Sequence, residues 1–138
     1  MRSRSAAQRR YIKRTLLFSG LYVLSLFVAV YLHSREMLDG PMAYPLAVLP
    51  GLCIAGVFLA IGRLIVEEED EFIRMLIVRQ SLIATGFALS ISTIYGFLNS
   101  FDLAPHLDAY WTTVLWFAGL GVGATANRLQ YGAWGECA

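Results

Sequence analysis

The most concentrated set of ionisable side chains in the sequence is a run of five acidic residues, Glu67, Glu68, Glu69, Asp70 and Glu71. Paired carboxylates can act as general acid and base, and clustered carboxylate oxygens can hold Ca²⁺ or Mg²⁺. Adjacent residues of a helix point in different directions, however, and the ligand spacing of a calcium loop is absent. We therefore predict no catalytic residue here. We favour a solvated, salt-bridged surface, used to dock a basic partner, over a metal site.

The two histidines of the chain, His33 and His106, are the other candidates for metal chemistry. Acidic residues lie within a few positions of each of them. Two histidines with carboxylates can bind Zn²⁺, and two histidines can ligate a haem. Neither histidine has a partner at the spacing of such sites, so we predict no metal and no cofactor.

Other catalytic chemistry lacks its essential residues. Cys53 lies inside an apolar stretch and Cys137 near the C-terminus, so they cannot form the outer-face Cys-x-x-Cys pair of a membrane thiol oxidoreductase. Glycine-rich phosphate loops and nucleophile elbows are absent from the sequence. The formal net charge of +1 also excludes a basic nucleic-acid binder. We predict that the protein is not an enzyme.

The acidic run and the histidines are positioned by four apolar stretches. These stretches comprise residues 15–32, 45–62, 81–98 and 110–126. None of them contains Asp, Glu, Lys, Arg or His, so an intramembrane proton relay has no carboxylate. Each stretch approaches the roughly 20 residues that cross a bilayer as a helix. The sequence therefore predicts an all-α, polytopic membrane protein, a bundle of four transmembrane helices.

The composition agrees with a lipid environment. Of the 138 residues, 57% are hydrophobic and 15% are charged, and the mean hydropathy is +0.58. A soluble domain is about 25% charged. The bilayer itself is thus the first expected partner.

Basic residues set the expected orientation. Arg35 is the single one of the 11 Lys and Arg residues that falls on the side of the bilayer opposite the N-terminus. This bias predicts that both termini are cytoplasmic. The chain then divides into a basic segment (residues 1–14) that contacts anionic lipid headgroups, a transmembrane domain (15–127) with an acidic cytoplasmic link (63–80), and a tail (128–138). We expect the first helix to be retained, because no signal-peptide cleavage site follows it.

Small residues recur every four positions in the third and fourth stretches. They are Ala84, Ala88, Ser92 and Gly96 in one, and Gly119 and Gly123 in the other. Such rows let helices approach closely in lipid. Packing within the chain accounts for most of them, and contact with a second copy or another membrane protein stays open.

The acidic run also predicts where helices begin and end. Negative side chains stabilise a helix N-terminus, so we expect the third helix to begin near Asp70. Arg74 then lies one turn after Asp70, and Arg63 lies one turn before Glu67 if the second helix extends that far. We expect Arg74 and Arg79 to reach anionic headgroups.

The end of the acidic run carries a resemblance. Residues 70–75 read Asp-Glu-Phe-Ile-Arg-Met and lead into an apolar helix of a small four-span chain. This arrangement resembles uncharacterised small inner-membrane proteins of bacteria. The resemblance implies a bacterial inner membrane and the same topology, and it carries no activity to transfer.

Together these features predict an accessory, scaffolding or regulatory role. The basic segment 1–14 and the acidic surface 67–71, with Arg74 and Arg79, would be presented to a partner, or would bind each other within one chain or between two. The alternative is a homo-oligomeric channel or carrier for a small solute. Its uncharged path would be lined by the hydroxyl groups of Ser81, Thr85, Ser90, Ser92, Thr93 and Tyr95.

Overall fold

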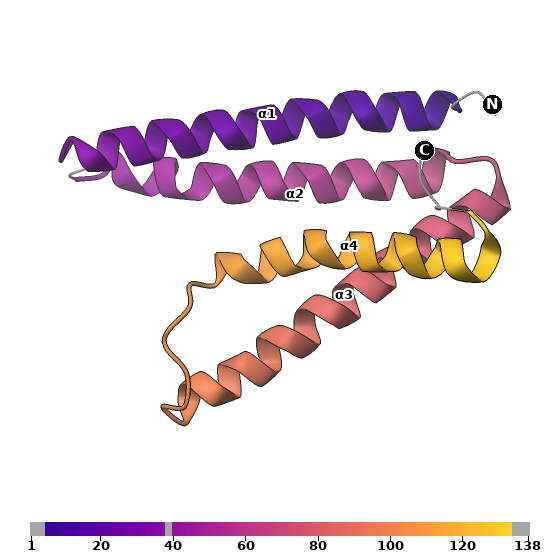
Figure 1. The fold of residues 1–138 in the computed structure, drawn as a ribbon. Coiled ribbons are helices and arrows are strands. Elements are labelled where there is room, and N and C mark those ends of the chain that lie inside the picture. Colours follow the sequence, from indigo (N-terminus) through magenta and orange to yellow (C-terminus); the bar gives the residue numbers. More distant parts are fainter. Residues whose placement is uncertain (1–4, 38–39, 134–138) are drawn as a thin grey trace. The chain divides into compact units, whose positions relative to one another are not determined.

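The structure, a computed structural model, describes residues 5–37 and 40–133 of the chain. Four helices make up its regular structure: α1 (Ala6–Ser34), α2 (Ala43–Glu67), α3 (Glu71–Ser100) and α4 (Tyr110–Tyr131) (Figure 1). The prediction of an all-α fold with four helices is confirmed. Residues 1–4 of the basic segment, and Cys137, lie outside the described residues.

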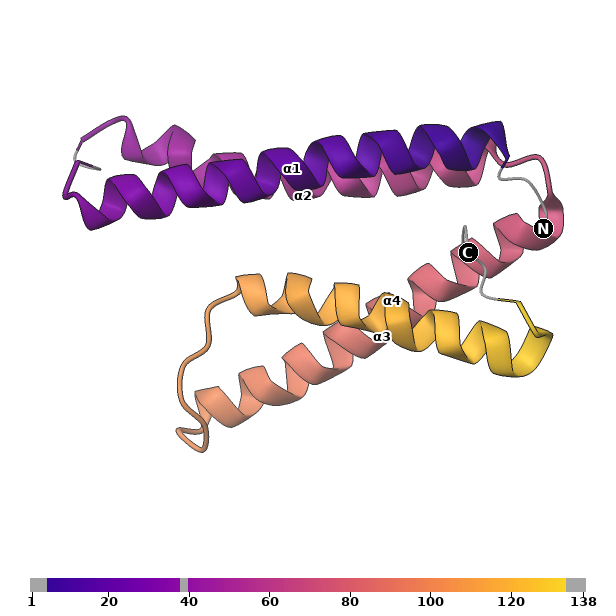
Figure 2. The same ribbon diagram turned by 45° about the horizontal axis from the view of Figure 1, so that its top comes forward.

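The chain forms two compact units, residues 1–68 and 69–138. In the first unit α1 lies alongside α2, and in the second α3 packs on α4 (Figures 1 and 2). Each unit is therefore a helical hairpin whose two helices follow each other in the sequence. Assembly of the two hairpins into one bundle stays a prediction.

Three of the helices, α1, α2 and α3, are long and apolar enough to cross a membrane. The shortest of them, α2, has 25 residues, and at 1.5 Å per residue this gives about 37 Å, more than a hydrocarbon core of roughly 30 Å. Many of their large apolar side chains face outwards; Phe27, for example, is 71% exposed. Such surfaces are costly in water and favourable in lipid, so the fold is compatible with a multi-pass membrane protein. The fourth helix, α4, is not among these candidate spans.

Local signals explain where the helices begin. Ser5 and Gln8 form a capping box at the start of α1: the Ser5 hydroxyl accepts from the Gln8 N–H at 3.1 Å, and the Ser5 N–H donates to Gln8 Oε1 at 3.2 Å. Asp70 caps α3, because its Oδ1 accepts from the N–H groups of Phe72 at 2.9 Å and Ile73 at 3.3 Å. The predicted start of the third helix near Asp70 is confirmed.

The hairpin of α3 and α4 is antiparallel along most of its length. The Asn127 amide donates to Leu76 O at 3.0 Å near one end, and Ser92 donates to Thr112 Oγ1 at 3.1 Å near the other. Between them the two helices nearly touch. A Cβ built on Gly119 would lie 2.8 Å from Ala84 Cα. Glycine is required there because the backbones leave no room for a side chain.

Candidate functional site

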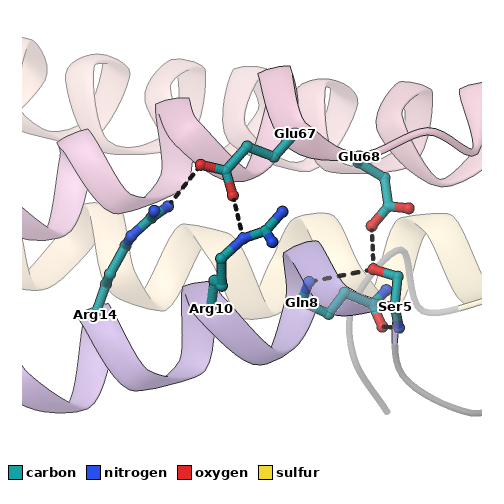
Figure 3. A network of polar contacts seen from close by, with 6 residues as sticks. All are labelled: Ser5, Gln8, Arg10, Arg14, Glu67 and Glu68. Atoms are coloured by element: carbon teal, nitrogen blue, oxygen red, sulfur yellow. Dashed lines mark hydrogen bonds and ion pairs between the residues drawn. The ribbon is translucent and has the colours of Figure 1, made fainter.

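The densest polar network in the described residues joins the first turns of α1 to the end of α2 (Figure 3). We call it the polar junction; its members are Ser5, Gln8, Arg10, Arg14, Glu67 and Glu68. Arg10 Nε donates to Glu67 Oε2 at 2.8 Å, and Arg14 Nη1 donates to Glu67 Oε1 at 3.0 Å. The two arginines lie one turn apart on α1, so they reach the same carboxylate. Each carboxylate oxygen thus has its own guanidinium.

Glu68 forms the second half of the polar junction. Its Oε2 accepts from the Ser5 hydroxyl at 2.9 Å, while the same hydroxyl oxygen accepts from the Gln8 N–H. A hydroxyl can donate once and accept as well, so Ser5 caps α1 and binds Glu68 together. Glu68 is only 2% exposed, so little of it is accessible to a partner.

The charges of the polar junction act on Glu67. The hydrogen bond from Arg10, then that from Arg14, lowers the pKa of the Glu67 carboxyl below its ordinary value of 4.5, against a smaller opposing effect of desolvation. The ionised carboxylate therefore stabilises the contact between α1 and α2 at pH values above 4.5. Protonation removes this contribution as the pH falls through the lowered pKa.

We expect a carboxyl NMR titration of Glu67 in detergent micelles to have its midpoint below 4.5. Arg10→Gln should raise this midpoint most and Arg14→Gln less, because the Arg10 hydrogen bond has the larger effect. Arg9→Gln is the matched control, since Arg9 is exposed and lies outside the junction. Equal midpoints in the wild type and in Arg10→Gln would contradict the ion pairs of the junction.

Arg63 and Glu67 lie one turn apart on α2, as the sequence places them. The helix α2 does extend to Glu67, but the described residues contain no ion pair between Arg63 and Glu67. Glu67 instead pairs with two arginines of α1. Charge-assisted hydrogen bonds from two guanidinium groups of the neighbouring helix hold the Glu67 carboxylate.

The remaining charged residues that were predicted to bind a partner have different surroundings. Glu69 and Glu71 are exposed, whereas Asp70 is half-buried and caps α3. Arg74 is half-buried one turn into α3. The Arg79 side chain hydrogen-bonds to Gln130 of α4, and its guanidinium lies 5.0 Å from the centre of the Tyr131 ring. Arg79 therefore joins α3 to α4.

Most of the small residues predicted to pack helices meet between α3 and α4. Ala84 and Ala88 are buried on one helix, and Gly119 and Gly123 on the other. A Cβ on Gly123 would lie 2.8 Å from the backbone oxygen of Gln80. Gly96 lies apart from this contact, because it is exposed and a Cβ there would meet nothing within 4 Å.

A polar seam that the sequence reasoning missed runs through the same interface. Gln80 Nε2 donates to Leu120 O at 3.0 Å, and Trp116 Nε1 donates to Thr85 Oγ1 at 3.0 Å. Of the hydroxyls that could line a solute path, Ser81 donates to Ile77 O within α3 and Ser92 donates to Thr112 across the hairpin, whereas Ser90 and Thr93 are exposed. The hydrogen bonds between the two helices therefore hold α3 on α4.

The two histidines belong to different hairpins of the chain. His33 lies in the last turn of α1 and His106 in the loop before α4, and both are exposed. Among the residues that the structure describes, no group of three or more His, Cys, Asp or Glu side chains could hold a metal ion. Cys53 is buried and free.

These features define a class: an all-helical protein of two hairpins with three candidate membrane spans and a salt-bridged junction at the end of one hairpin. No protein family, curated protein or solved structure matches the chain. What the protein does must therefore be argued from its own surfaces.

Proposed function

We propose that the chain is a four-span protein of a bacterial inner membrane with both termini in the cytoplasm. The distribution of basic residues supports this orientation, because Arg10 and Arg14 precede the first span while Arg63, Arg74 and Arg79 lie between the second and third. The polar junction supports it as well. Its charged groups belong outside the hydrocarbon core, at the same end of α1 and α2.

The fourth span in this proposal is α4. It packs antiparallel on α3 from Asn127 to Thr112, so it follows a candidate span back through the same depth. Its glycines and threonines lower its hydropathy, yet no charged residue precedes Arg128 within it. Its polar groups at the interface are hydrogen-bonded to α3, which removes much of their cost in lipid.

The proposed role is that of an accessory or scaffolding protein whose cytoplasmic acidic link docks a basic partner. The observation that supports this role is that the acidic run contains two kinds of residue, bound and exposed. Glu67, Glu68 and Asp70 are bound within their own hairpins, whereas Glu69 and Glu71 are exposed and have no ion pair in the described part of the chain. The proposed docking surface therefore consists of Glu69 and Glu71.

The exposed cations of α1 have a separate proposed partner. Arg9 and Lys13 lie on the first turns of α1 and take no part in the polar junction. At the cytoplasmic surface of a bilayer each such charge contributes about 1 kcal/mol of attraction to anionic lipids. They would therefore hold α1 against anionic headgroups while Arg10 and Arg14 bind Glu67.

The test is native mass spectrometry of the full chain after gentle extraction from its own membrane. We expect a stoichiometric foreign subunit with the wild type and its loss in a double variant, Glu69→Gln with Glu71→Gln. Each exposed charge pair across such an interface contributes up to about 1 kcal/mol, so loss of two pairs should weaken binding by up to about thirtyfold. Glu36→Gln is the control, because Glu36 is exposed after α1, on the opposite side of the bilayer in this topology.

A foreign subunit that stays bound to the double variant would contradict the acidic docking surface. A bare homo-oligomer in both samples would contradict the accessory role and favour the channel or carrier. Flux into liposomes would then be the next measurement.

A further inference from the structure

A cavity of about 280 Å³ lies where α3 and α4 approach the loop that joins them. Figures 1 and 2 show the two helices diverging towards this loop. The lining is mainly apolar and includes Ile91, Leu107 and Leu115. Ligand pockets have this character, a mainly apolar lining with a few polar groups that fix orientation.

Most polar groups of the lining are already used by the protein. The Tyr95 hydroxyl donates to Pro105 O at 2.7 Å, the Asn99 amide donates to Ala104 O at 3.3 Å, and Ser92 donates to Thr112. The first two bonds hold the loop against the end of α3, and the third joins α3 to α4. The cavity is therefore shaped by a hydrogen-bonded loop rather than by an open chain.

Two polar side chains of the lining remain unused. In the part of the chain that the structure describes, neither the Asp108 carboxylate nor the His106 imidazole has a hydrogen bond or ion pair. Asp108 is the single residue of the lining with a fixed formal charge. Trp111 also belongs to the lining, and its ring is stacked on Tyr110 with the centroids 5.8 Å apart.

The start of α4 also lines the cavity, and the positive end of a helix attracts anions. Here the first N–H groups are engaged, because Trp111 N donates to Asp108 O and Thr112 N to Ala109 O, both at 3.1 Å. The Asp108 carboxylate stands at the same place and would repel an anion. Charge and ring together favour a cation, which a carboxylate and an aromatic face both attract.

We propose that this cavity binds a small monocation with an apolar body, a primary ammonium compound. The ammonium group lies at Asp108 and Trp111, and the apolar body lies against Ile91, Leu107 and Leu115. A free hydrophobic amine has this chemistry, whereas the phosphate that adjoins the ammonium group of an ethanolamine lipid would be repelled by Asp108. The proposal goes beyond the docking role and uses no residue of the acidic link.

The test uses the full chain in dodecyl maltoside, a detergent without ammonium groups. Three probes of matched shape are compared by equilibrium dialysis against empty micelles: 2-phenylethylammonium, 2-phenylethanol and 3-phenylpropanoate. We expect the ammonium compound to bind about fivefold or more tightly than the alcohol, after correction for micelle partitioning. The carboxylate should bind most weakly.

One pair of variants tests the charge of Asp108, and a second pair tests whether the probes occupy the cavity beside Gly96. Asp108→Asn should abolish the preference for the ammonium compound, whereas Asp102→Asn should keep it, since Asp102 is in the same loop but not in the lining. Asparagine suits Asp102, whose φ is 57°. Gly96→Leu should fill the cavity and abolish binding of all three probes. Gly86→Leu is its control on α3, because a Cβ meets nothing within 4 Å at either glycine.

Equal affinity for the ammonium compound and the alcohol would overturn the proposal, as would an Asp108→Asn variant that keeps the preference. Binding that survives Gly96→Leu, with helicity equal to that of Gly86→Leu, would overturn the placement in this cavity. Native mass spectrometry adds a further check. An ethanolamine lipid retained by the wild type and lost in Gly96→Leu would overturn the proposal of a monocation, because such a lipid also carries a phosphate.

Discussion

Leucine in place of Gly119 is expected to separate α3 from α4, whereas leucine in place of Gly121 is expected to be tolerated. A Cβ on Gly119 would lie 2.8 Å from Ala84 Cα and 2.9 Å from Ala84 O, both backbone atoms that move only with the whole helix. A Cβ on Gly121 meets nothing within 4 Å. Overpacking a tight contact costs about 1–3 kcal/mol, and a backbone obstacle places Gly119→Leu at the upper end.

The measurement is the free energy of unfolding of the full chain in mixed micelles, with increasing sodium dodecyl sulfate as denaturant. Gly123→Leu should behave as Gly119→Leu does, since its Cβ would lie 2.8 Å from Gln80 O. Trp116 gives a local signal, because its indole N–H is bonded to Thr85 across the two helices. An equal loss of unfolding free energy in Gly119→Leu and Gly121→Leu would contradict the close contact of α3 and α4 at Gly119.

The helices could be predicted from the sequence because their signals are local. Charge-free stretches of about 18 residues are unambiguous, and Asp70 followed by an apolar helix is a recognisable start. The start of α1 was missed: its helix extends back through the basic segment to Ala6. The signal was present, since Ser5 and Gln8 have the spacing of a capping box.

The candidate site was harder to predict, because its contacts depend on the register between helices. Arg63 lies one turn from Glu67 in the sequence, which favours a pair within α2. The structure pairs Glu67 with Arg10 and Arg14, and no local pattern sets which turn of α1 lies beside the end of α2. The sequence reasoning left open that the basic and acidic regions bind each other within one chain, and the polar junction is a contact of that kind.

The row of small residues shows the same limit. Its period of four places Ala84, Ala88, Ser92 and Gly96 on one face, yet Gly96 lies outside the contact. The reason is geometric, because α3 and α4 diverge towards their loop (Figure 2). A row of small residues on one helix predicts which face of that helix packs. It does not predict how far along that face the partner helix stays in contact. The space left beside Gly96 belongs to the cavity at the loop.

The second large effect is expected in the other hairpin, where Gly56 of α2 faces Phe18 of α1. A Cβ on Gly56 would lie 2.3 Å from Phe18 Cδ1 and 2.5 Å from Cε1, so any side chain must displace the ring. Gly56→Leu should therefore lower the free energy of unfolding by about 1–3 kcal/mol. Gly51→Leu, on the same helix, is the control, because a Cβ there meets nothing within 4 Å.

A double variant that exchanges the sizes of the two side chains, Phe18→Ala with Gly56→Leu, tests this contact directly. The obstacle at Gly56 is a side chain, whereas the obstacle at Gly119 is backbone, so only the first can be removed by substitution. Phe18→Ala alone loses the packing of the ring, but combined with Gly56→Leu it should recover stability, with a coupling of about 0.5–3 kcal/mol in a double-mutant cycle. Phe18→Ala should not rescue Gly119→Leu, since the two contacts lie in different hairpins. A double variant whose losses simply add would show that Gly56 and Phe18 do not face each other.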